Sequence, residues 1–183
     1  MRTLRSVASV FVMSALIVSC SDQSTGPAVD GPQFAASGPV VHHVSVGGPD
    51  ACAPPGCDAN FSLVANEKAD GSVSGQWQDT FAGGGEGIHV SVDCLNVVDN
   101  GAMVGGVITH GTFFGVDVSG QRAITAVIDN GTSANDPADQ ISYSIFPQWT
   151  GGFPPDDPSF CLTRLPSDNP FLSDLARGQV KVW

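Results

Sequence analysis

The sequence is poor in positive charge. Its 183 residues include only seven Lys and Arg against 18 Asp and Glu, which gives a formal net charge of −11 at pH 7. A surface of this charge repels the phosphates of nucleic acids and the headgroups of anionic lipids. We therefore exclude nucleic acid as a partner. The carboxylates are scattered along the chain, which favours a role in solubility over a dedicated cation site.

Familiar hydrolase motifs are also missing. The chain has no Gly-x-Ser-x-Gly, no His-Glu-x-x-His and no glycine loop for phosphate. Glu67 and Glu86 are the only glutamates, so a two-carboxylate hydrolase would have to use aspartates. These absences favour a non-catalytic protein. A hydrolase of extracellular polymer that works through aspartate carboxylates is the alternative.

Only one long apolar run is present, at the start of the chain. Residues 7–18 follow Arg2 and Arg5 and are almost uninterrupted in their apolar character. The run is too short for a spanning helix and is typical of a removable export signal. Without Arg2 and Arg5, five basic residues remain against 18 acidic ones, a charge of 5 − 18 = −13.

The segment Ile17-Val18-Ser19-Cys20 resembles the lipobox of bacterial lipoproteins. The resemblance implies that residues 1–19 are a signal peptide and that Cys20 carries a lipid, which anchors the protein to a membrane without crossing it. Ser21 resembles the pattern of outer-membrane lipoproteins and predicts a location in the bacterial cell envelope, outside the cytoplasm. An ordinary secretory signal with an incidental cysteine is the alternative.

Four cysteines follow Cys20. An even number in an exported chain indicates disulfides, with three possible connectivities. Cys52 and Cys57 enclose a turn-forming Ala-Pro-Pro-Gly segment, so we expect bridges Cys52–Cys57 and Cys94–Cys161. The second bridge would stabilise the fold by roughly 4 kcal/mol on the chain-entropy model. A metal site on Cys52 and Cys57 is the alternative, although no second cysteine pair accompanies them.

The rest of the chain divides into a tether and one domain. Residues 20–38 are rich in Ser, Gly, Pro, Ala and Gln and predict a flexible tether. Residues 39–183 are long enough for a single domain with its own core. Helix signals are poor, and we expect at most one short helix, at residues 170–177.

Strand signals dominate the domain. Apolar and polar residues alternate most regularly at 72–78 and 88–94, and the second pattern places Cys94 on the same face as Ile88. We predict an all-β fold, a small antiparallel β-sandwich or barrel of about eight strands held by disulfides. The expected strands are 40–46, 60–66, 72–78, 88–94, 102–109, 123–128, 140–146 and 179–183.

Part of this pattern resembles a known kind of module. The segments 71–76, 89–95 and 102–108, together with Asp129-Asn130-Gly131, Asp136-Pro137 and Asp139, are similar to secreted bacterial β-domains of the post-COAP-like type. The resemblance covers about half of the chain that would remain after signal removal. It implies a β-domain appended to a surface protein and carries no particular reaction.

The loop at residues 129–139 is the best candidate for a metal site. It offers the carboxylates of Asp129, Asp136 and Asp139 and the amide of Asn130, and calcium takes about six to eight such oxygens. The spacing does not match an EF-hand. An ordinary turn between two strands is the alternative, and we favour it because oxygen-rich loops are common there.

Two histidines form a second candidate. If Asn100 and Gly101 make a two-residue turn, Ser91 lies opposite His110, and His89 lies diagonally from His110 on the same face. A zinc or catalytic pair is then within reach. A one-residue bulge at this turn would instead send His110 to the opposite face.

Aromatic residues suggest a ligand surface. Trp77 lies on the apolar side of its strand and is expected in the core. Trp149 is surrounded by prolines and glycines in a long loop, so we expect Trp149, with Tyr143, to form an exposed surface that stacks on sugars. The sequence thus predicts a membrane-anchored, non-catalytic binding or structural module of the cell envelope. Its partner would be an envelope polymer or protein.

Overall fold

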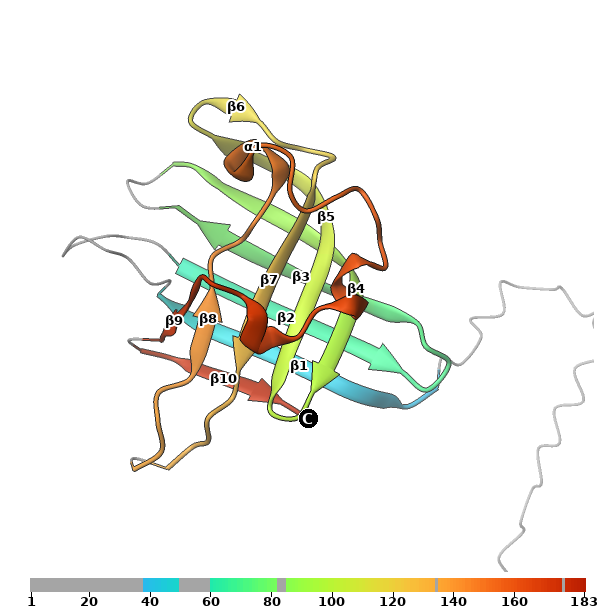
Figure 1. Cartoon of the computed structure of the whole chain (residues 1–183), viewed down its shortest axis with the longest axis vertical. Helices are drawn as coiled ribbons and strands as arrows, with labels where there is room; N and C mark the ends of the chain where they lie inside the picture. Colours follow the sequence, from blue (N-terminus) through green and yellow to red (C-terminus); the bar gives the residue numbers. More distant parts are fainter. Residues whose placement is uncertain (1–37, 50–59, 82–84, 134, 176) are drawn as a thin grey trace, which may run out of the picture. The chain divides into compact units, whose positions relative to one another are not determined.

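The computed structural model describes residues 38–49, 60–81, 85–133, 135–175 and 177–183 (Figure 1). The chain separates into two units, Met1–Phe34 and Ala35–Trp183, and the described residues all belong to the second. Among them, no helix is long and apolar enough to span a membrane.

The domain is built on one antiparallel sheet. Its strands follow the order β10-β1-β2-β3-β4-β5-β7-β8-β9, and the short β6 pairs with β5. The bounds are β1 Val40–Pro49, β2 Asn60–Lys68, β3 Val73–Thr80, β4 Gly87–Val98, β5 Gly101–Phe113, β6 Val116–Asp117, β7 Arg122–Ile128, β8 Gln140–Ser142, β9 Leu172–Asp174 and β10 Gln179–Val182.

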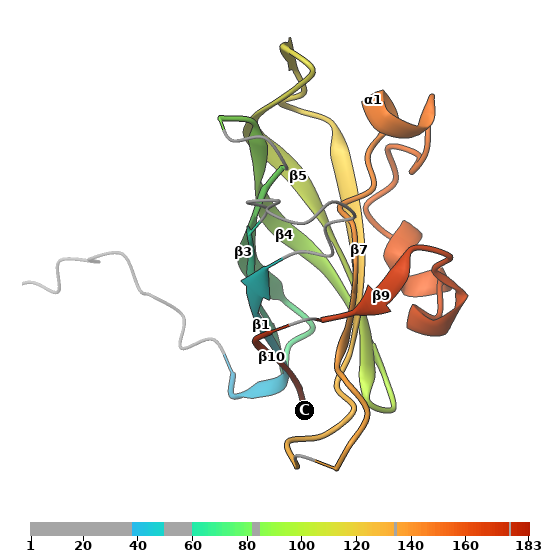
Figure 2. The same cartoon turned by 90° about the vertical axis from the view of Figure 1, so that its left-hand side faces the viewer.

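The sheet curls into a half-barrel around its main core. Figure 2 shows β1 and β3 on one side and β7 on the other. In β2 and β3 every second residue faces inward and is buried or half-buried, including the buried Phe61, Leu63 and Trp77, while the residues between them are more exposed. This alternation is the period of a strand with one wet face, and it makes the inner face of the curl apolar. The core position of Trp77 is confirmed.

A long excursion between β8 and β9 covers part of the outer face of the sheet. It contains α1 (Pro147–Thr150) and two 3₁₀ turns, η1 (Phe160–Thr163) and η2 (Pro166–Asp168). In Figure 2 the excursion lies beyond β7, away from β1 and β3. A second, smaller apolar cluster lies beneath it. Its buried members are Cys94, Met103, Ile124, Ala126, Ile145 and Cys161.

The strand predictions are largely confirmed. Each of the eight expected segments contains a strand, although 140–146 is a strand only at Gln140–Ser142, and the two short strands β6 and β9 were not expected. The helix predicted at 170–177 is wrong, because Leu172–Asp174 pairs with β8 as β9. Pairing to an open sheet edge outweighs the weak helix propensity of so short a segment.

The turn between β4 and β5 differs from the prediction. Val98 pairs with Gly101, so the two-residue turn is Asp99-Asn100, and Asp99 adopts a positive φ of 53°. Gly101 lies inside β5, where an added Cβ would be only 3.0 Å from a carbon of Pro166 in η2. Its lack of a side chain allows that close approach, and Asp99 tolerates the left-handed conformation.

One β-bulge lies at Thr109 in β5. His89 pairs with His110 and Val90 pairs with Ile108, which leaves Thr109 as the extra residue. Without the extra residue, His110 would share the inner face with Ile108. The bulge therefore brings His110 to the outer face, directly opposite His89. The diagonal relation predicted from the turn is wrong.

A second bulge lies at Asp93 in β4. Val92 and Cys94 pair with successive residues of β5, so Asp93 is the extra residue. Val92 and Leu95 lie in the main core, whereas Cys94 lies in the smaller cluster under the excursion. The prediction that Cys94 shares a face with Ile88 is therefore wrong, since the bulge rotates Cys94 outward.

Carboxylates cover the free edge of β10. The N–H groups of Val180 and Val182 donate to the side chains of Asp139 (2.7 Å) and Asp129 (3.2 Å). An unpaired strand edge exposes such N–H groups and invites pairing with other chains. The side chains of Asp129 and Asp139, which follow β7, thus satisfy the edge of β10. In a closed barrel another strand would pair with this edge.

We expect Asp139→Ala to lower the free energy of unfolding by about 1–3 kcal/mol, because the buried Val180 N–H loses its acceptor. Urea denaturation monitored by circular dichroism measures this loss. Asp136→Ala is the matched control, since its carboxylate accepts the exposed Ser133 N–H, and we expect it to cost less. Equal losses in the two variants would contradict the role assigned to Asp139.

Candidate functional site

The outer face of β2 to β5 is polar and built from small or amide side chains. Direct pairing aligns Ser62, Gln78, His89 and His110 in one row across the four strands. Gln76 and Ser91 are also directly paired, in the neighbouring row. Because the intervening residues fill the core, these side chains all face outward.

His89 and His110 are in contact at the centre of this face. Their ring centroids are 3.9 Å apart and their planes differ by 20°, so the imidazoles are stacked. Partial burial lowers the pKa of His89, and the charge on His110 lowers it further. At neutral pH His89 is therefore held in its uncharged form, with a nitrogen lone pair available.

Two hollows open on either side of the histidine pair. Their volumes are about 590 and 580 Å³, and Gln78, His89 and His110 line both. The first also contains Glu86 and Asp117. Glu86 accepts hydrogen bonds from the N–H groups of two residues at the tip of the β5–β6 hairpin, 2.9 and 2.6 Å long. Glu86 therefore also holds the tip of this hairpin next to the hollow.

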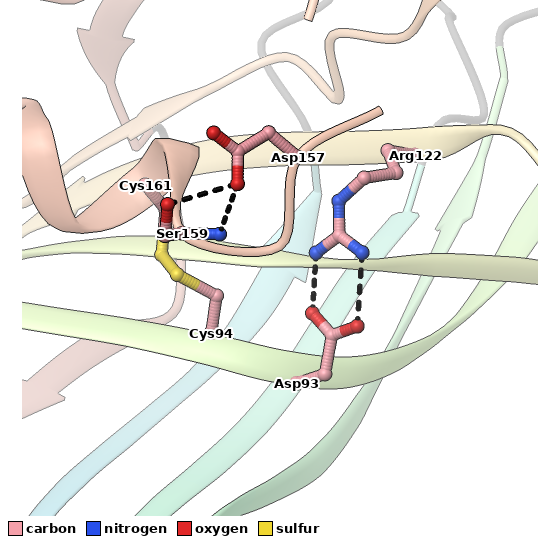
Figure 3. Close-up of polar contacts among 6 residues, drawn as sticks. All are labelled: Asp93, Cys94, Arg122, Asp157, Ser159 and Cys161. Carbon is pink, nitrogen blue, oxygen red and sulfur yellow. Dashed lines mark hydrogen bonds and ion pairs between the residues drawn. A yellow bond between two sulfur atoms is a disulfide. The ribbon is translucent and has the colours of Figure 1, made fainter. Parts of the chain in front are cut away.

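A disulfide fastens the excursion to the sheet, and an ion pair beside it joins two strands of the sheet (Figure 3). The predicted Cys94–Cys161 bridge is confirmed and joins β4 to η1. Next to it, Arg122 of β7 makes a two-pronged pair with Asp93, the bulge residue of β4. The Arg122 side chain is 7 % exposed and that of Asp93 is 41 % exposed. The buried guanidinium therefore depends on a partner at the surface.

Asp157 helps to shape the approach to η1. Its carboxylate accepts hydrogen bonds from the backbone and the hydroxyl of Ser159, at 2.9 and 2.8 Å (Figure 3). These bonds lower the pKa of Asp157, and the positive charge of Arg122 adds to the effect. Asp157 thus stays ionised near the one buried arginine of the described residues.

The predicted ligand residues meet on the excursion. The ring centroids of Tyr143 and Trp149 are 6.2 Å apart, edge to face, and those of Trp149 and Phe171 are 5.1 Å apart with the planes tilted by 51°. Trp149 is 36 % exposed and Phe171 39 % exposed. We call Tyr143, Trp149 and Phe171 the aromatic cluster. It has the size and half-exposed character of a surface that packs against a ligand.

A small apolar pocket adjoins the aromatic cluster. Its volume is about 210 Å³, and its apolar lining is Met103, Ile124, Ile145, Phe153, Leu165, Pro170 and Phe171. Arg164, Asp168 and Asn169 add polar groups. Asn169 is held in place because its amide donates to Ser142 Oγ and its carbonyl accepts the N–H of Phe171. An apolar pocket with few, fixed polar groups is typical of a binding site.

The acidic loop uses its predicted calcium ligands as hydrogen-bond acceptors. Besides the bonds to β10, Asp129 accepts the N–H of Gly131, and Asp139 accepts the N–H of Asn130. Asn130 itself donates to the backbone of Ala138. No group of three or more His, Cys, Asp or Glu side chains is arranged to hold a metal within the described residues. Calcium stays a prediction, in which the ion would compete with these N–H groups.

Other predicted site residues lie outside the part of the chain that the structure describes. They are the lipid-bearing Cys20 and the predicted disulfide partners Cys52 and Cys57. The signal peptide at 1–19 and nearly all of the tether at 20–38 also lie outside it.

Sequence reasoning missed several residues of the site. Phe171 falls in the segment predicted to be helical, and nothing in its neighbourhood indicates contact with Trp149. The pair of Arg122 with Asp93 was missed as well, because it depends on the bulge in β4. A lone arginine within an apolar strand, as at 122–128, is a signal that could have indicated a buried ion pair.

Comparisons with family models, curated proteins and solved structures found no match to this chain.

We expect Asp93→Ala to lower the free energy of unfolding by about 1–3 kcal/mol, because the buried Arg122 loses a charged acceptor. In an Arg122→Met background the same substitution should cost close to nothing. Denaturant melts of the four chains give the coupling between the two side chains as a double-mutant cycle. If Asp93→Ala costs the same in both backgrounds, the ion pair does not stabilise the fold.

Proposed function

We propose that this chain is a lipid-anchored module of the bacterial cell envelope that binds a neutral glycan without catalysis, through the aromatic cluster. The observation that carries the proposal is the contact of Tyr143 with Trp149 and of Trp149 with Phe171 on one exposed surface. Flat, half-exposed rings supply a large apolar area together with a polar edge.

The net charge of the chain favours a neutral ligand, and the disulfide favours a rigid binding surface. The chain carries a net charge of −11, which repels acidic polymers. The rings lie on an excursion that a disulfide fixes to β4, so little conformational freedom is lost when a ligand binds. The adjoining pocket of about 210 Å³ has room for a small apolar substituent of the sugar.

The location rests on the start of the chain. Residues 17–20 resemble a lipobox. Within residues 1–19 a short basic start precedes an apolar run, as in an export signal. The resemblance to post-COAP-like surface modules agrees with a β-domain displayed outside the cytoplasm. A binding module held by a lipid would keep its ligand close to the membrane.

The binding surface is tested by titrating the full chain with a neutral oligosaccharide such as chitohexaose, with tryptophan fluorescence as the readout. We expect Trp149→Ala to weaken binding roughly tenfold or more with an unchanged melting temperature. Leu162→Ala, which changes another exposed apolar side chain of the excursion, is the control and should bind as the parent does. Equal binding by Trp149→Ala would remove the aromatic cluster from the site.

The anchor is tested by Cys20→Ser in the full chain. Because the lipid is expected on the Cys20 sulfur, we expect the variant to move from the membrane fraction to the soluble fraction after cell lysis. Immunoblotting of the two fractions measures the shift, and Cys94→Ser serves as a cysteine control that keeps the anchor. A Cys20→Ser protein that stays fully in the membrane fraction would refute lipid anchoring.

A hydrolase of extracellular polymer is the second candidate. The observation in its favour is the hollow beside the histidine pair, which carries the carboxylates Glu86 and Asp117 together with the buried Asp79. Carboxylates next to imidazoles are the groups that general acid and base catalysis requires. Release of new reducing ends during the same titration would favour this candidate over simple binding.

A further inference from the structure

His89 and His110 lie close enough for one metal ion to reach both side chains. Two nitrogens bound to tetrahedral zinc at about 2.0–2.1 Å each lie about 3.3 Å apart. The rings of His89 and His110 have centroids 3.9 Å apart and nearly parallel planes, so one ring must rotate about its Cβ–Cγ bond before the lone pairs of two nitrogens converge on one ion. The pair projects from directly opposed positions on β4 and β5, which fixes the distance between the two Cβ atoms.

Thr109 fixes the proton on one of the two rings. Its hydroxyl donates to the backbone oxygen of His89 at 3.1 Å, and its oxygen also lies 3.4 Å from Nδ1 of His110. Because the hydroxyl has a single proton, which the His89 oxygen accepts, Nδ1 of His110 is the donor in the second contact. In the neutral ring, Nε2 of His110 then carries the lone pair. Metal-binding histidines are oriented in this way, with the other ring nitrogen donating to a neighbour.

The surroundings leave room for further ligands. Both hollows reach the pair, so water has access from two sides. Gln78 lies directly opposite His89 on β3 and brings an amide oxygen to the same row. Glu86 and Asp117 line one hollow and give it a negative potential that favours cations.

We propose that His89 and His110 bind a divalent transition metal, Zn²⁺ or Cu²⁺, on the outer face of β4 and β5. Imidazole nitrogen suits these ions, whereas calcium and magnesium take oxygen ligands. Two protein ligands leave coordination positions for water or for a group on a second molecule. The site is separate from the aromatic cluster, and its existence does not depend on the proposed function.

Calorimetric titration of the full chain, purified without a histidine tag, tests the proposal with Zn²⁺, Cu²⁺ and Ca²⁺. We expect Zn²⁺ and Cu²⁺ to bind with a stoichiometry of one at this site, and Ca²⁺ to give no heat there. His89→Gln and His110→Gln should each weaken binding about tenfold or more, and Thr109→Val should weaken it less. The matched control is His43→Gln on β1, whose ring bonds to Asn66 and stacks on Trp183, and it should bind as the parent does.

The spectrum of bound Cu²⁺ gives an independent readout on the unmodified protein. Electron paramagnetic resonance should show coupling to two imidazole nitrogens, and this coupling should be reduced in either glutamine variant. The proposal is overturned if the double variant His89→Gln/His110→Gln binds Zn²⁺ as tightly as the parent. It is equally overturned if His43→Gln abolishes binding, or if the Cu²⁺ spectrum shows no nitrogen coupling. Circular dichroism of each variant verifies that it is folded.

Discussion

The two single-residue bulges between β4 and β5 are the constraint on which the rest of the structure depends. They lie on different strands and cancel, so the pair keeps a two-residue turn at one end and a regular ladder at the other. Each bulge inverts the alternation of inward-facing and outward-facing residues along its own strand. The bulge at Asp93 turns Cys94 toward the excursion, and the carboxylate of Asp93 pairs with Arg122 of β7. The bulge at Thr109 sets His110 opposite His89. Both candidate surfaces thus follow from one irregular strand pair.

Several acidic residues stabilise the fold by accepting backbone N–H groups, which composition alone does not reveal. Asp129 and Asp139 supply acceptors along the free edge of β10, and Glu86 does the same at a hairpin tip. A carboxylate accepts several backbone N–H groups more strongly than a neutral acceptor does. Some of the excess carboxylates therefore satisfy backbone N–H groups that no neighbouring strand pairs.

The sequence predicted the strands well because alternation is local, and β2 and β3 show it clearly. The Cys94–Cys161 bridge also followed, from elimination among few cysteines. Register did not follow, because a bulge adds one residue without a compositional signal, so Cys94 was assigned to the wrong face and His110 to a diagonal position instead of the one directly opposite His89. The meeting of Phe171 with Trp149 depends on the path of a long excursion, which short-range patterns do not determine.

The disulfide also sets how the domain would respond to force. A pull applied between Gly38, where the described domain begins, and Trp149 travels along β1 to β4, crosses the Cys94–Cys161 bridge and returns to Trp149 through η1. The bridge bypasses the longer stretch of chain from Cys94 to Trp149, which includes β5 and β7, so this stretch carries little of the load. The strands that form the floor beneath the aromatic residues would keep their shape even while the first strands of the sheet are stretched.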